Sequence, residues 1–129
     1  MSDEFRDAAG PAVGGESFRE LLAAERAATL AQITALSREF EGIVAANAFV
    51  AVDDEHDPEG SSTAFERAHV ASMLDRARKH LTELDQASAR LEQGDYGMCV
   101  KCGEPIPKER LEARPASTMC VRCAASGPR

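Results

Sequence analysis

Four cysteines in the last third of the chain are the residues best suited to chemistry. They form two Cys-x-x-Cys pairs, Cys99 with Cys102 and Cys120 with Cys123, and 17 residues separate the pairs. Zinc prefers four thiolates at the corners of a tetrahedron, and two such pairs at this separation are typical of a four-cysteine zinc site. The spacing therefore predicts one structural zinc ion bound by all four cysteines.

Two other uses of these cysteines remain open at this point. Paired cysteines also form disulfides or redox-active dithiols, and a zinc–thiolate cluster can itself act as a redox switch. Residues 1–15 are acidic and lack the apolar stretch of a secretory signal. We therefore expect a reducing, cytoplasmic compartment, in which disulfides rarely persist.

An acidic block is the second group of residues with chemical potential. Residues 53–60 contain five carboxylates and no base, in a chain whose net charge is −7. The carboxylates are those of Asp53, Asp54, Glu55, Asp57 and Glu59. Pro58 and Gly60 in the same block predict a turn. The block is either a solvated turn whose acids cap the helices or a charged tip that a partner recognises.

The remaining residues give no positive indication of an enzyme. The sequence has no P-loop, no Gly-rich nucleotide fingerprint, no nucleophile elbow and no His-Glu-x-x-His motif. The acidic net charge is the opposite of the broad basic face that phosphate binding requires, so we expect no sequence-specific DNA binding. No apolar run approaches the roughly 20 residues that span a bilayer, so we expect no membrane insertion.

Two heptad patterns predict the elements that position these groups. The first seam consists of Leu22, Arg26, Thr29, Ile33, Leu36, Phe40, Ile43, Asn47 and Val50. The second consists of Val70, Leu74, Ala77, Leu81, Leu84, Ser88 and Leu91. Steps that alternate between four and three residues are typical of a coiled coil. Capping boxes at Ser17 and Thr63 predict where the helices begin, and Gly94 predicts where the second one ends.

Together these patterns predict a mainly α fold, a long antiparallel two-helix coiled-coil hairpin with an acidic tip plus a small four-cysteine zinc finger. The expected parts are a flexible tail over 1–15, the hairpin over 16–93 with its tip near 53–60, the finger over 94–125 and a C-terminal tail over 126–129. At 1.5 Å per residue, the stalk would be on the order of 45–50 Å long. Five like charges at one end of so long a rod favour the interpretation that a partner recognises the acidic tip.

Residues 96–123 resemble the zinc finger of the TraR/DksA family. The resemblance rests on Tyr-Gly-Met-Cys-Val-Lys-Cys-Gly at 96–103, Arg-Leu-Glu-Ala-Arg-Pro at 110–115 and Cys-Val-Arg-Cys at 120–123. The upstream hairpin with an acidic turn is also similar to the family architecture. The resemblance implies a bacterial transcription regulator that binds the RNA polymerase core directly. It further implies that the hairpin enters the secondary channel and that the tip, near the catalytic centre, modulates initiation.

The resemblance also implies roles for two arginines. Arg76 falls on a basic helix position important in the family, and Arg114 falls on an arginine associated with binding of guanosine tetraphosphate. Other basic positions of that nucleotide site are occupied here by Glu83 and Ala124, and Gly60 stands where the family tip has its second aspartate. The polymerase is therefore the implied partner, whereas the alarmone site lacks part of its basic set.

Two other classes of function remain as alternatives. The chain could be a zinc-stabilised coiled-coil adaptor that binds some other protein, and a pull-down of polymerase core subunits separates this function from the first. It could also be a thiol-based redox sensor, which would show reactive cysteines and zinc release under mild oxidant.

Overall fold

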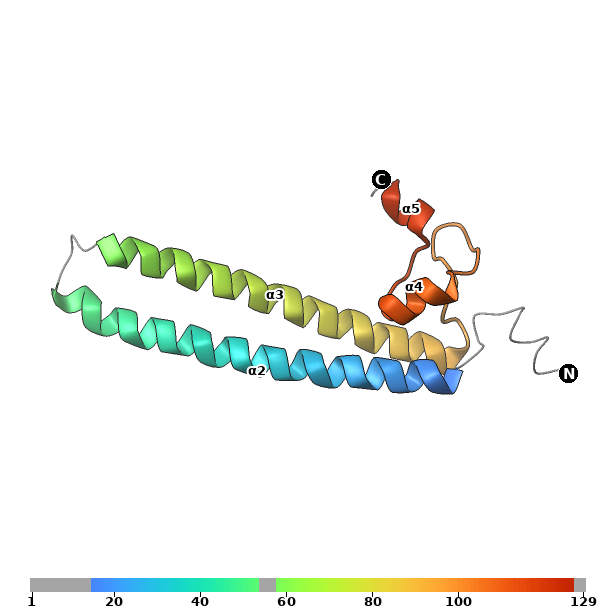
Figure 1. Cartoon of the computed structure of the whole chain (residues 1–129), viewed down its shortest axis with the longest axis horizontal. Helices are drawn as coiled ribbons and strands as arrows, with labels where there is room; N and C mark the ends of the chain where they lie inside the picture. The colour runs from blue at the N-terminus through green and yellow to red at the C-terminus, as the bar shows by residue number, and fades with distance from the viewer. Residues whose placement is uncertain (1–14, 54–57, 127–129) are drawn as a thin grey trace, which may run out of the picture. The chain divides into compact units, whose positions relative to one another are not determined.

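The computed structural model of the chain describes residues 15–53 and 58–126, and this part is mainly α-helical. The helices are α2 (Gly15–Asp53), α3 (Pro58–Gln93), α4 (Lys108–Ala113) and α5 (Val121–Ala125), as Figure 1 shows. An isolated antiparallel bridge joins Met98 and Pro105, and the described residues form no longer strand. These elements confirm the predicted fold class of two long helices with a small four-cysteine module.

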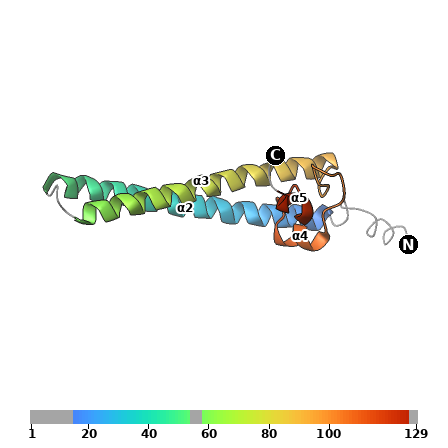
Figure 2. The same cartoon turned by 90° about the horizontal axis from the view of Figure 1, so that it is seen from above.

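The chain divides into two compact units. The first, called the finger unit, comprises Met1–Ala27 and Thr82–Arg129, and the second, called the stalk unit, comprises Ala28–Leu81. Helices α2 and α3 contribute to both units and lie side by side within each of them (Figure 2). Within residues 15–53 and 58–126, none of the helices combines the length and apolar character that a membrane crossing requires.

Two ion pairs in the finger unit show that α2 and α3 are antiparallel. Arg19 Nη2 lies 3.2 Å from Glu92 Oε2, and Arg26 Nε lies 2.7 Å from Asp85 Oδ1. The residue number therefore rises along α2 as it falls along α3. Arg26, predicted on the apolar seam, is exposed and uses its position beside α3 for this pairing.

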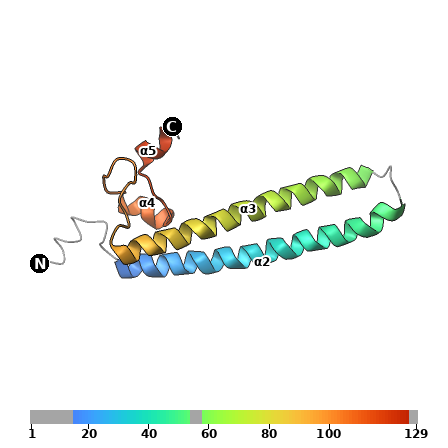
Figure 3. The same ribbon diagram turned by 180° about the vertical axis from the view of Figure 1, so that it is seen from behind.

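The finger unit has one core that includes residues of the long helices and of the zinc-finger segment. Its buried members are Phe18, Leu22, Leu84, Ala87, Tyr96, Cys99, Ile106, Leu111 and Cys120. The ring of Phe18 on α2 lies 5.4 Å from the ring of Tyr96, and the Tyr96 hydroxyl donates a 2.7 Å hydrogen bond to the Pro115 carbonyl. The ends of the two long helices and the finger segment therefore pack as one body, in which α4 and α5 follow the Tyr96 segment (Figure 3).

The stalk unit has a narrower core made of the predicted seam. Leu36 of α2 packs with Val70, Leu74 and Ala77 of α3, and Thr29 is also buried. The half-buried residues around this core are Ile33, Phe40, Ile43 and Met73. The seam positions Asn47 and Val50 lie outside the residues whose side chains the structure describes.

Both long helices begin earlier than their capping boxes predict. Helix α2 begins at Gly15 rather than at Ser17, and α3 begins at Pro58 rather than at Thr63. Proline suits the first position of a helix, because its fixed φ is already helical and its missing N–H would have no intrahelical partner there. The proline that predicts a turn thus starts the second helix.

The C-terminal end of α3 lies where Gly94 predicts it. Gly94 has φ of +85°, in the left-handed region that favours glycine. Its N–H donates to the Leu91 carbonyl at 3.2 Å, and the Asp95 N–H donates to the Arg90 carbonyl at 2.8 Å. These two bonds form a Schellman motif, which turns the chain out of α3 toward Tyr96.

Candidate functional site

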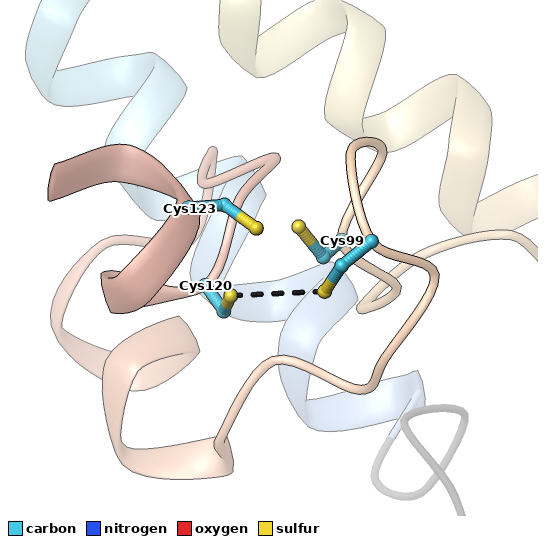
Figure 4. A group of neighbouring side chains, drawn as sticks. Cys99, Cys120 and Cys123 are labelled. Atoms are coloured by element: carbon cyan, nitrogen blue, oxygen red, sulfur yellow. Dashed lines mark hydrogen bonds between the residues drawn. The ribbon is translucent and has the colours of Figure 1, made fainter. Parts of the chain in front are cut away.

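The four cysteines lie together in the finger unit. All four Sγ atoms are within 4.8 Å of one another, and those of Cys102 and Cys120 are 3.9 Å apart. Thiolates bound tetrahedrally at about 2.3 Å from zinc lie about 3.8 Å from each other. Figure 4 shows the side chains of Cys99, Cys120 and Cys123 pointing toward one another. The donor set and its spacing therefore fit zinc, and the described residues contain no second cluster of this kind.

Two tight turns place the sulfurs. The Gly103 N–H donates to the Cys99 carbonyl at 2.9 Å, and the Ala124 N–H donates to the Cys120 carbonyl at the same distance. Gly103 has φ of +79°, which explains why glycine follows the first pair of cysteines. Each turn presents both sulfurs of its pair to one side, as a shared metal ion requires.

Further hydrogen bonds fix the two turns relative to each other. The Val100 N–H donates to the Thr118 carbonyl at 2.9 Å, and Arg110 Nε on α4 donates to the Met119 carbonyl at 2.9 Å. The two cysteine pairs are 17 residues apart in the sequence. These hydrogen bonds hold the segment directly before Cys120 in place, and one of them joins it to the turn of the first pair. The sulfurs are positioned by the fold itself.

The electrostatics of the cluster favour a bound cation. The backbone amide of Cys102 is the main cause that lowers the pKa of Cys99 to about 6, and that of Cys123 lowers the pKa of Cys120. The hydrogen bond between the side chains of Cys123 and Cys120 is the main cause that raises the pKa of Cys123 to about 12. Each turn thus stabilises one thiolate, while further ionisation is opposed by the charge already present. A divalent cation relieves that repulsion and allows all four thiols to ionise.

The burial of the cysteines indicates a structural centre. Cys99 and Cys120 are buried in the core of the finger unit, Cys123 is half-buried and Cys102 is exposed. Four protein thiolates would fill the tetrahedral coordination of zinc and leave no position for a substrate. The cluster therefore connects the two cysteine turns through the core of the finger unit, and only Cys102 is exposed at the surface.

Arg76 and Arg114 are exposed, and they belong to different units. Arg76 lies on α3 in the stalk unit, and Arg114 directly follows α4 in the finger unit. Neither side chain forms a hydrogen bond or ion pair with the described residues. Glu83 on α3 and Ala124 on α5, the two departures from the family pattern, are also exposed.

The predicted tip is only partly within the described residues. Asp53 is the last residue of α2 and Glu59 lies in the first turn of α3, but their side chains are not described. Asp54, Glu55 and Asp57 lie outside the described residues. The role of these five carboxylates stays a prediction.

Sequence reasoning missed three residues that matter for the finger unit. Phe18 is buried four residues before Leu22, the first position of the predicted seam, and Ala87 is buried one residue before the predicted Ser88. Tyr96 is also buried, where it connects Phe18 to the finger. The heptad pattern could not reveal these positions, because here the long helices face the finger as well as each other. The available signal was Tyr96 itself, three residues before Cys99 and the first residue of the motif that resembles the family finger.

Comparisons with known proteins agree with the geometry of the finger. Residues 94–126 match the family described as "Prokaryotic dksA/traR C4-type zinc finger". The RNA polymerase-binding transcription factor DksA of Caulobacter vibrioides is 48% identical over 61 residues, which cover 47% of this chain and 43% of that protein. The protein of the same name from Escherichia coli K12 is 39% identical over 49 residues, or 38% of this chain and 32% of the relative. The chain thus spans less than half the length of these curated relatives.

Solved structures resemble the chain over more of its length. The transcription factor DksA2 from Pseudomonas aeruginosa matches with a TM-score of 0.72 and 27% identity, covering 98% of this chain and 95% of that one. The DnaK suppressor protein from Agrobacterium tumefaciens C58 matches with a TM-score of 0.52 and 25% identity, covering 86% and 91%. The C4-type match and the four clustered cysteines support a structural zinc ion. From its finger sequence and its cysteine cluster, the chain carries a C4-type zinc finger of the DksA/TraR family, and its helical fold resembles that of DksA2.

Proposed function

We propose that this protein is a bacterial transcription regulator that binds the RNA polymerase core directly. The observation that carries the proposal is the likeness to DksA2, which covers 98% of the chain and so extends beyond the finger to both long helices. The relatives that match the finger carry the name RNA polymerase-binding transcription factor. The same name on sequence relatives and the same fold in a transcription factor support one role for the whole chain.

In the proposed mechanism, the hairpin of residues 16–93 enters the secondary channel of the polymerase and modulates initiation. A pair of α-helices is slender, because each helix is only about 10–12 Å across with its side chains. Several small residues on the solvent side of α2 in the described stalk unit add little to this width. These exposed small residues are Ala28, Ala31, Ala35, Gly42, Ala45 and Ala46.

The acidic tip near residues 53–60 is the proposed effector. Its carboxylates would act near the catalytic centre, where they can attract basic side chains or coordinate magnesium. The finger, over residues 94–125, is the proposed structural base. We assign Cys99, Cys102, Cys120 and Cys123 as its four zinc ligands. In this proposal the chain itself catalyses no reaction.

The proposal places the protein in the cytoplasm with its polymerase and gives it no DNA sequence to recognise. Arg76 and Arg114 are available for contacts with the polymerase or a nucleotide, because both are exposed without partners among the described residues. Glu83 adds a negative charge and Ala124 supplies no charge at two positions that are basic in the family's alarmone site. We therefore expect guanosine tetraphosphate to bind weakly.

Binding of the zinc-loaded protein to bacterial core RNA polymerase, with a photo-cross-linker at position 57, tests the proposal. We expect cross-links inside the secondary channel close to the catalytic centre. Absence of binding at low salt, where electrostatic association is strongest, would contradict the proposal and favour the adaptor function instead.

Neutralisation of the tip tests the effector separately from docking. Replacing the five tip carboxylates by their amides should abolish the effect on transcription and leave polymerase binding within a few-fold of wild type, because rim charges chiefly change association rates. The five residues are Asp53, Asp54, Glu55, Asp57 and Glu59. A control replaces three exposed acids of the finger unit, Glu104, Glu109 and Glu112, by glutamine. In vitro transcription that is still regulated by the neutral-tip variant would rule out the tip as the effector.

A further inference from the structure

Phe65 on α3 of the stalk unit is the most exposed large apolar side chain among the described residues. It is 77% exposed, compared with 67% for Val100, 58% for Val121 and 40% for both Leu30 and Val44. Single exposed aliphatic residues are common on protein surfaces. A phenylalanine that is almost wholly in water is less usual, because its ring offers a large apolar area to bury.

The fold itself does not require an aromatic ring at this position. Phe65 precedes the buried Leu74 by nine residues, which is two and a half helical turns, so it lies on the opposite side of α3 from the core. Phenylalanine is also a weaker helix former than alanine. Neither packing against the described residues nor helix formation therefore explains the ring.

Phe65 belongs to a row of exposed residues on the solvent side of α3, called the outer stripe. The stripe consists of Phe65, His69, Ser72, Arg76 and Lys79, which recur at intervals of three, four or seven residues. All five are exposed, and the intervals keep them on one side of the helix. An aromatic ring thus lies at one end of the stripe and two cations lie at the other.

The charge of the outer stripe has one sign. Arg76 and Lys79 form no hydrogen bond or ion pair with the described residues. The acids of α3 in the described stalk unit, Glu66 and Asp75, lie on the flanks of the helix and outside the stripe, and the next acid on the stripe's side of α3 is Glu83 of the finger unit. A surface that complements the stripe must therefore supply both an apolar pocket and carboxylates.

The corresponding side of α2 has a different character. Its exposed residues in the described stalk unit include several of alanine and glycine, two aliphatic residues (Leu30 and Val44), charged residues such as Arg38 and Glu41, and no aromatic residue. Small side chains offer little area to bury in a contact, whereas interface hot spots are enriched in aromatic residues and arginine. Of the two helices in the described stalk unit, α3 is the one that exposes an aromatic ring, with a 77% exposed Phe65.

We propose that the outer stripe is the surface through which the stalk unit contacts RNA polymerase, with Phe65 inserted as an apolar anchor into a pocket bordered by carboxylates. This inference rests on the proposed function, and it names the face and the anchor of that contact. Arg76 and Lys79 at the other end of the stripe pair with the acids of the polymerase surface and speed association.

The Phe65→Ala substitution tests the anchor without disturbing the helix. Alanine is the better helix former, so the variant should keep the wild-type melting temperature or exceed it slightly. We expect its affinity for core polymerase to fall about 30-fold, as for a typical aromatic hot spot. Phe65→Leu should recover part of the loss, because it keeps apolar area. The control Leu30→Ala removes an exposed apolar side chain from α2 of the same unit and should change affinity by less than about 2-fold.

A charge reversal tests the cationic end of the stripe. Lys79→Glu should slow association with core polymerase at low salt, and the difference from wild type should shrink as salt is added. The control Arg38→Glu makes the same change of two charges on the solvent side of α2. It should slow association much less.

The outcomes separate the two proposals. If wild-type protein binds polymerase and Phe65→Ala binds equally well, the anchor is overturned while the proposed function stands. An equal loss in Phe65→Ala and Leu30→Ala would also overturn it, since the contact would then not be specific to the outer stripe. If wild-type protein does not bind polymerase, the proposed function fails and the anchor fails with it.

Discussion

The two units of this chain are held together in different ways. The finger unit combines a broad core around Tyr96 with the hydrogen bond to Pro115 and a four-sulfur cluster. The stalk unit relies on a narrow seam in which Leu36 packs against α3. A pair of helices without a second layer can bury only one stripe of each helix. The comparison teaches that stability is concentrated in the finger, which leaves most of the stalk surface open for recognition.

The difference is visible in individual residues. Leu22 and Leu84 in the finger unit are 1% and 0% exposed, whereas Leu36 and Leu74 in the stalk unit are 6% and 7% exposed. The finger core receives residues from the long helices and from the segments around the cysteines, so its side chains are enclosed from several directions. We therefore expect perturbations of the finger unit to cost more than equivalent perturbations of the stalk unit.

Loss of the metal should have the largest effect on stability, and it should destabilise the finger unit. Cys102→Ser removes one thiolate from an exposed position, so it creates no buried cavity, and its effect reports on the metal site. Structural zinc contributes about 10–16 kcal/mol to the folding of zinc-finger peptides near neutral pH. We expect the variant to lose zinc, as measured by mass spectrometry, and to lose hydrogen-exchange protection across residues 94–126.

The control for this variant lies in the same turn. Val100→Ala changes an exposed side chain between the two cysteines of the first pair and should retain one zinc ion per chain. An unchanged thermal transition in Cys102→Ser would refute the structural role of the metal.

The same leucine-to-alanine substitution in each core should show how much more tightly the finger core is packed than the seam of the stalk unit. Leu84→Ala in the finger unit should lower the free energy of unfolding by about 3–5 kcal/mol, in the upper range for buried leucines. Leu36→Ala in the stalk unit should cost about 2–3 kcal/mol, because the thin seam can relax around the lost atoms. Urea denaturation of both variants measures the difference. Equal costs would mean that the seam is packed as tightly as the finger core.

Alkaline pH should produce a more gradual effect, confined to the finger unit. Burial raises the pKa of Tyr96 to about 12, from an ordinary value of 10.0. Below pH 10 the phenol is protonated in both states, whereas between about 10 and 12 only the unfolded chain releases the proton. The free energy of unfolding should therefore fall by up to about 1.4 kcal/mol per pH unit in that window.

The Tyr96→Phe variant isolates this contribution from other groups that titrate at high pH. It should lose about 1 kcal/mol at neutral pH with the hydrogen bond to Pro115, and it should show a shallower decline between pH 10 and 12. Urea denaturation at several pH values measures both slopes. Parallel slopes for the two proteins would show that the phenol is not the titrating group.

The fold class and the cysteine cluster could be predicted because both depend on local spacing. The heptad pattern identified Leu36, Val70 and Leu74 as core residues without any knowledge of the finger. The end of α3 was also predictable, because the conformation of Gly94 is a local property of the chain.

Other features depend on tertiary contacts that no periodicity encodes. Phe18 and Ala87 are buried because the helix ends face Tyr96 as well as each other. The start of α3 at Pro58 was missed because proline suits both a turn and the first position of a helix. The exposure of Phe65 could be recognised only after the seam had been placed on the structure.

The packing of Tyr96 also gives the protein a built-in optical probe. It is the single tyrosine of a chain that has no tryptophan, and it lies in the core of the finger unit. Tyrosine fluorescence therefore reports on the finger alone, whereas far-UV circular dichroism is dominated by the two long helices. Recording both signals during one titration with a chelator would distinguish the response of the finger core from that of the long helices, in unlabelled protein and without a single substitution.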